Sequence, residues 1–190
     1  GKGPGIVRNV GGPIMRYLTK TEVLAIPADH LPLVCLSDNV TSWVAARIKA
    51  LQNGFWNHYM WYYRPAHMAT QDATFKVVPV YEYLLRHRLK LWWNPNWTAQ
   101  DRAILRGEIK KGLDEPWYNR CYDPLQIIGI RFGMRWLQIP GHYRICSDHA
   151  VYLKKIDPRY DLVHPSPPDI DRWLKETDGY EVYGRYSPDY

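Results

Sequence analysis

Short apolar runs, each closed by a turn residue, limit most strongly what this chain can fold into. Residues 33–36, 55–64, 75–78 and 89–93 have the length and the apolar or aromatic content of strands, and Pro65 ends the second of them. Segments with helical spacing lie between these runs in no regular order. We therefore expect an α+β fold, with a small antiparallel sheet packed against helices, rather than repeated βαβ units.

Helix-start signals mark the remaining segments. Residues 98–101 resemble a capping box, in which a Thr side chain caps the helix and the acidic residue three positions later caps it in return. Apolar residues recur at helical spacing over 40–51, after the capping candidates Ser37, Asp38 and Asn39. Further helices are expected to start near residues 79, 123, 146 and 167.

The length of 190 residues suits one domain with a substantial core. Residues 1–14 contain five glycines and two prolines and have little apolar pattern. We expect 1–30 to be a glycine-rich arm and lead-in, and 31–190 to be the folded domain. Residues 1–14 should add nothing to the core and should lie extended against a protein partner or be mobile.

Charge and composition exclude several classes of protein. The net charge of +6 is spread over scattered Lys and Arg residues, so no nucleic-acid partner is expected. No stretch is apolar for long enough to span a membrane, and no signal peptide is visible, which favours a cytoplasmic or virion-associated protein. Three cysteines give no disulfide framework and favour a reducing compartment.

No cofactor is expected, because the chain has neither a GxGxxG nor a Walker motif. His142, Cys146 and His149 are spaced like part of a metal site, but no fourth ligand is apparent, so no metal is expected either.

Two residues have the chemistry of a cysteine hydrolase. Cys146 stands where an extended segment meets a helix, and a helix N-terminus lowers the pKa of a thiol. His58 lies in an aromatic strand, which holds a general base in a fixed position. Each residue alone is more typical of a buried structural side chain than of a catalytic one. Cys35, inside an apolar run, is expected to be an inert core thiol.

The order of these segments resembles the circularly permuted NlpC-like peptidases of the papain-like superfamily, in which His precedes Cys. The strand at 33–36 with the helix to 51 resembles the opening of that family, and 56–62 resembles its S-H-x-x-I-Y strand. Residues 76–84 resemble its strand leading into V-x-x-x-x-Y-L, and 117–123 its G-x-P-Y-D helix entry. Ile145-Cys146-Ser147-Asp148 resembles its F-x-C-S-E nucleophile, and 165–170 its late T-P-x-D-L.

The resemblance covers residues 32–183 and implies a papain-like fold and acyl transfer through a thioester. Cys146 would be the nucleophile, His58 the base and Tyr143 a candidate oxyanion donor. The third residue, which orients His58, is expected about a dozen positions later, at Thr70, Gln71 or Asp72, and Gln71 is the preferred choice. The implied substrates are cell-wall peptides, other amides and lipid esters.

A second interpretation stays open. The family usually has small residues after the histidine, whereas Tyr59 and Met60 follow it here. Related domains also occur as structural parts of phage particles and other assemblies, sometimes without activity. The chain is therefore expected to be either a cysteine peptidase or amidase, or a catalytically silent papain-like domain that packs against protein partners.

Overall fold

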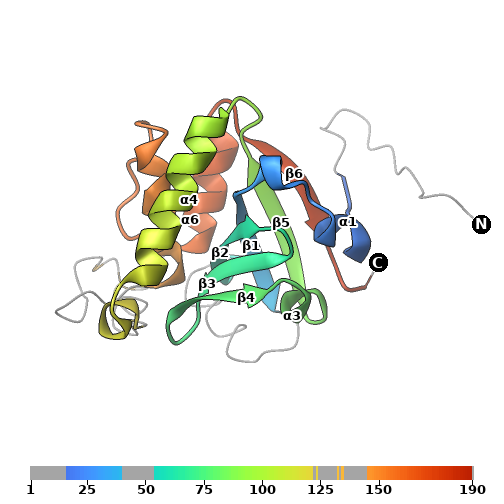
Figure 1. Ribbon diagram of the computed structural model, residues 1–190, viewed down its shortest axis with the longest axis horizontal. Helices are drawn as coiled ribbons and strands as arrows, with labels where there is room; N and C mark the ends of the chain where they lie inside the picture. The colour runs from blue at the N-terminus through green and yellow to red at the C-terminus, as the bar shows by residue number, and fades with distance from the viewer. Residues whose placement is uncertain are drawn as a thin grey trace, which may run out of the picture.

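A six-stranded antiparallel sheet forms the centre of the molecule (Figure 1). The computed structural model describes residues 16–39, 54–121, 123, 132, 134 and 145–189. The strand order is β4-β3-β2-β1-β5-β6, and every neighbouring pair is antiparallel. The strands are β1 (Leu33–Asn39), β2 (His58–Arg64), β3 (His67–Gln71), β4 (Phe75–Pro79), β5 (His87–Trp93) and β6 (Glu181–Tyr186).

The helices are α1 (Lys20–Leu24), α3 (Tyr81–Leu84), α4 (Ala99–Asp114) and α6 (Pro167–Glu176), and the 3-10 helices are η1 (Ala28–His30), η2 (Trp117–Arg120) and η3 (Cys146–Lys155). Reciprocal capping boxes begin the two longer α-helices. Thr98 pairs with Asp101 at α4, and Ser166 pairs with Asp169 at α6. The expected α+β class is confirmed.

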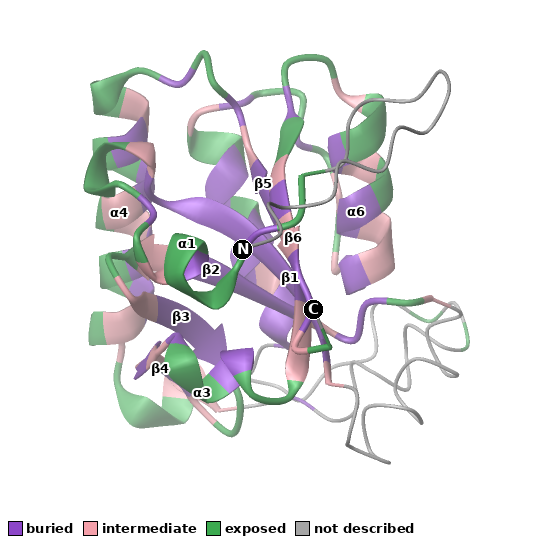
Figure 2. Cartoon of the chain, turned by 90° about the vertical axis from the view of Figure 1, so that its right-hand side faces the viewer, coloured by how far each residue is buried: buried purple, intermediate pink, exposed green. Residues whose placement is uncertain are grey.

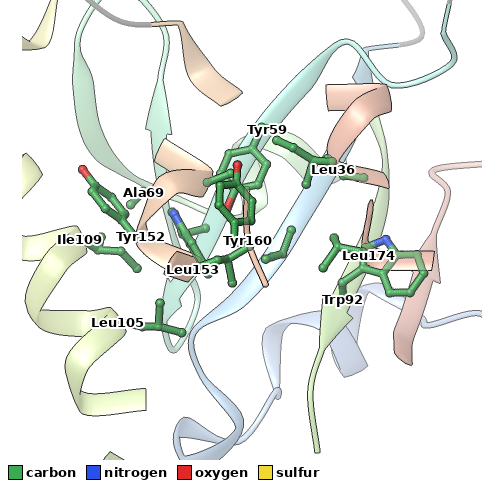
Figure 3. Close-up of a cluster of buried hydrophobic side chains, with 14 of the residues drawn as sticks. Leu36, Tyr59, Ala69, Trp92, Leu105, Ile109, Tyr152, Leu153, Tyr160 and Leu174 are labelled. Carbon is green, nitrogen blue, oxygen red and sulfur yellow. The ribbon is translucent and has the colours of Figure 1, made fainter. Parts of the chain in front are cut away.

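Each face of the sheet carries its own core, because side chains alternate along the strands. On one face, Tyr59 and Trp61 of β2 pack with residues of α4, η3 and α6 (Figure 3). On the other face, Met60 and Tyr62 pack with residues of α1 and α3. We call the first the helix face and the second the α1 face. The central strands are buried on both sides (Figure 2).

The sequence located most of the described elements. The expected strands at 33–36, 55–64, 75–78 and 89–93 all occur, although the second begins only at residue 58. The expected helices at 40–51 and after residue 123 lie outside the described residues.

The lead-in before residue 31 joins the α1-face core from residue 18 onward. Val23 is fully buried, and the Leu18 N–H donates a hydrogen bond to the Arg185 carbonyl at 2.7 Å. The expectation that residues 1–14 stay out of the core falls on residues that lie outside the described part. None of the helices in the described ranges has the length and apolar composition needed to cross a membrane.

Candidate active site

His58 is the first residue of β2, and its ring is held on the α1 face. Its Nε2 lies 2.6 Å from Thr70 Oγ1 in β3. The Tyr83 hydroxyl of α3 also donates to Thr70 Oγ1, at 3.2 Å, and the Tyr83 ring is parallel to the imidazole. The His58 side chain is 16% exposed, so the strand, Thr70 and Tyr83 fix its position without sealing it off.

Asp72 is the one carboxylate among the described residues within ion-pair distance of His58. Its Oδ1 lies 3.8 Å from His58 Nε2, and its Oδ2 also pairs with Lys76 at 3.2 Å. Burial lowers the pKa of His58, and the charge of Asp72 opposes part of this shift. The imidazole is therefore neutral at neutral pH, which is the form that a general base requires.

Cys146 is the first residue of η3 and is only 4% exposed. Burial raises the pKa of its thiol to about 12, which is opposite to the lowering expected from its place at a helix start. Interactions of the thiol with the backbone of Tyr59 and of Ser147 oppose part of this rise in pKa. The loss of hydration therefore raises the pKa by more than the helix start lowers it, and Cys146 is a protonated thiol at neutral pH.

The thiol meets β2 at the residue next to His58. The Tyr59 side chain and Cys146 belong to the core of the helix face, whereas the contacts of His58 with Thr70 and Tyr83 lie on the α1 face. The packing of Cys146 with Tyr59 brings the start of η3 to the start of the strand that carries the imidazole. The sequence placed these residues 88 positions apart, and the fold brings their segments into contact.

Gln71, the preferred orienting residue, contacts a different histidine. Its Oε1 lies 2.9 Å from His149 Nε2, and its Nε2 donates to the Arg120 carbonyl at 2.6 Å. Consecutive residues of a strand point to opposite faces, so Gln71 reaches the helix face while Thr70 reaches His58. Of the three candidates left open, Thr70 makes the close contact with the imidazole and Asp72 the longer one.

The remaining expected site residues can be placed briefly. Tyr143 and His142 lie outside the described residues. His149, the other member of the suspected metal set, has its Nδ1 at 3.0 Å from the Tyr152 hydroxyl. Across the described ranges, no three His, Cys, Asp or Glu side chains are grouped closely enough to hold a metal ion. Cys35 is fully buried in β1, as expected, and burial raises its pKa.

Tyr83 is the residue that the sequence analysis missed. It lies in the segment 76–84, for which no site residue was expected, yet its hydroxyl donates to Thr70 and its ring is parallel to the imidazole. A comparison with known protein families and with curated proteins found no match to this chain.

Proposed function

We propose that this chain is a cysteine hydrolase of the permuted papain-like type, with Cys146 as nucleophile, His58 as base and Thr70 as the residue that orients the base. The observation that carries the proposal is the meeting of η3 and β2. Cys146 of η3 packs in one core cluster with Tyr59 of β2, and His58, the residue before Tyr59, is held through Nε2 by Thr70. The order of the sequence motifs supports the same assignment.

Thr70 selects the tautomer that the reaction needs. A hydroxyl oxygen can accept two hydrogen bonds, and Thr70 Oγ1 accepts one from Tyr83. If it also accepts from Nε2–H of His58, the lone pair of the imidazole is on Nδ1. Nδ1 is then the nitrogen that is left to take up a proton, and Asp72 would stabilise the imidazolium that forms.

The reaction begins from a neutral pair, since the thiol is protonated and the imidazole uncharged. His58 removes the proton as the sulfur attacks the carbonyl carbon, and a thioester forms as the leaving group takes the proton from the imidazolium. Water, deprotonated by His58, then releases the acid and restores the thiol. Peptides, other amides and lipid esters all carry the carbonyl that this sequence requires.

A small activated ester tests the proposal without knowledge of the natural substrate. Treatment with p-nitrophenyl acetate should add one acetyl group to Cys146, located by peptide mass spectrometry. The adduct should be absent in Cys146→Ser. His58→Gln should slow acetylation by about a hundredfold, the lower range for loss of a general base. Thr70→Val should slow it by about tenfold because the ring loses its orienting bond.

The other two cysteines serve as internal controls. Buried Cys35 should stay unmodified in the folded protein, and half-exposed Cys121 should react equally in every variant. Acetylation of Cys146 that is no faster than that of Cys35, or that is indifferent to His58, would contradict the enzymatic proposal.

A second candidate function is a silent papain-like domain that serves as a structural part of an assembly such as a phage particle. The burial of Cys146 and the rise of its pKa to about 12 favour it, because a protonated core thiol is unreactive. The bulky Tyr59 beside the site is also fully buried and packs on the helix face. An unreactive Cys146 in the acetylation experiment is the result that this candidate predicts.

A further inference from the structure

A pocket of about 430 Å³ lies between α6 and the β5–β6 edge of the sheet, whose ribbons are seen together in Figure 2. Two aromatic side chains from the segment before β2, Phe55 and Trp56, form part of its wall. A neighbouring pocket of about 520 Å³ shares Phe55, Trp56 and Arg185 with it. The two pockets share part of their lining, and the proposed hydrolase chemistry uses none of their residues.

Basic side chains dominate the first pocket. Its lining includes one carboxylate, Asp171, and four basic residues, namely Lys90, Arg172, Lys175 and Arg185. Lys90 and Arg185 are direct partners across β5 and β6. Like charges opposite each other in a sheet repel, so the strand pairing sets two cations against each other at the pocket.

The single carboxylate is already engaged. Asp171 Oδ1 accepts from Lys90 Nζ at 2.6 Å and from Trp92 Nε1 at 3.0 Å, and its Oδ2 pairs with Lys175 at 2.9 Å. Lys90 is 1% exposed and also lies 4.4 Å from the centre of the Trp92 ring. Burial lowers the pKa of Lys90 to about 8, and the charge of Arg185 adds to this shift.

Arg185 is left without a matching anion in the described part of the chain. No carboxylate of the described residues lies within ion-pair distance of it, and its Nε is covered yet has no hydrogen-bond acceptor there. Among the described residues, the one carboxylate in contact with Arg172, which is 68% exposed, is that of Asp169 at 4.0 Å. Within the described part of the chain, neither guanidinium group of the pocket therefore has a carboxylate closer than this, and the covered Nε of Arg185 favours an acceptor.

We propose that this pocket binds an anionic group, a carboxylate or a phosphate, carried on an apolar or aromatic body. The guanidinium groups of Arg185 and Arg172 would bind the anion, since each presents planar paired donors that match two oxygens. The body would lie against Phe55, which is 51% exposed, and Trp56. A volume of about 430 Å³ is within the usual range for small-molecule sites.

Three matched probes test the proposal by calorimetry on the full chain: phenyl phosphate, benzoate and neutral benzyl alcohol. Both anions should bind at least about tenfold more tightly than the alcohol, and added salt should weaken them. Arg185→Gln should weaken anion binding by about tenfold, whereas Arg185→Lys, which keeps the charge, should lose less. Arg172→Gln, at an exposed position, tests the same claim with little risk to folding.

Lys110→Gln is the control, because Lys110 is an exposed lysine of α4 that does not line the pocket. Tighter binding of phenyl phosphate would assign the site to phosphate esters, and tighter binding of benzoate to carboxylates such as acidic peptides. Equal affinity for benzyl alcohol, or anion binding that Arg185→Gln and Arg172→Gln leave unchanged, would overturn the proposal. Binding is measured without turnover, so the result does not depend on Cys146.

Discussion

Two histidines bind to consecutive residues of β3, on opposite faces of the sheet, and their surroundings differ. His58 contacts Thr70 on the α1 face, and His149 contacts Gln71 on the helix face. Both contacts join an imidazole nitrogen to a side-chain oxygen of β3, at 2.6 Å for His58 and 2.9 Å for His149. What separates them is whether one or both nitrogens of each ring are engaged.

Both ring nitrogens and one face of the His149 imidazole are in contact with other side chains. The Gln71 amide donates to the Arg120 carbonyl, so its oxygen must accept from His149 Nε2–H, and Nδ1 then accepts from the Tyr152 hydroxyl. Phe75 stacks on the ring with centroids 3.7 Å apart. A histidine with both nitrogens engaged and one face covered is suited to holding η3 on the sheet and has no nitrogen left for proton transfer.

His58 has a different set of partners. Its close hydrogen bond is the one to Thr70, and Asp72 lies farther from the same nitrogen. The ring is partly exposed, and Nδ1 remains for chemistry. Proximity to a strand therefore does not separate the two histidines, whereas the number of engaged ring nitrogens does.

Replacing the β3 side chain that contacts each histidine should change the stability of the protein by very different amounts. Gln71→Leu leaves the His149 N–H and the Arg120 carbonyl without their partner, and we expect a loss of about 2–4 kcal/mol in the free energy of unfolding. Thr70→Val keeps the shape of the side chain and should cost only about 1 kcal/mol. Denaturation in urea measures both values.

The effects on Cys146 acetylation should run in the opposite order. Thr70→Val should slow the reaction although the protein stays stable, and folded Gln71→Leu should react at close to the normal rate. If Gln71→Leu lowered the rate more than Thr70→Val at equal folded fraction, His149 and not His58 would be the histidine that matters.

Lowering the pH should destabilise the folded protein through two histidines, His58 and His87. Burial lowers the pKa of His58, and burial together with the charge of His58 lowers that of His87 to about 4. Below the ordinary value of about 6.5, the unfolded chain therefore binds more protons than the folded one, and stability falls as the pH falls towards 4. Each histidine contributes at most about 1.4 kcal/mol per pH unit.

Urea denaturation between pH 7 and pH 4.5 measures this dependence. His87→Gln should flatten it, since the variant lacks one of the two groups. If the stability of His87→Gln falls with acid as steeply as that of the natural chain, His87 is not responsible for the pH dependence.

The choice of Gln71 over Thr70 shows where sequence reasoning reached its limit. Arg64 and His67 pair across the turn, and a regular ladder from there would put Gln71 on the same face as His58. A bulge between Tyr62 and Arg64 shifts the register by one residue, so Met60 pairs with Thr70 and the faces exchange. No residue pattern in 58–72 predicts the extra residue in β2.

The elements themselves were easier to predict than the electrostatics. Strands such as β1 and caps such as Thr98 with Asp101 depend on neighbouring residues, and the sequence displays these directly. The pKa of Cys146 depends instead on how completely η3 is buried against β2, which is a property of packing between distant segments. The start of a helix does favour the thiolate, but the burial of Cys146 raises the pKa of its thiol by more.

A smaller effect than that of Gln71→Leu is expected from a matched pair of Tyr→Phe changes, one on each face. Tyr152→Phe removes the donor to His149 Nδ1 from a covered site, and we expect a loss of about 1–2 kcal/mol. Tyr83→Phe removes a bond to Thr70 but leaves Thr70 to accept from His58, so the cost should be below about 1 kcal/mol. The two side chains are almost equally buried, at 6% and 7% exposed, so burial does not explain a difference. Urea denaturation compares them, and equal losses would mean that His149 is no more firmly held than His58.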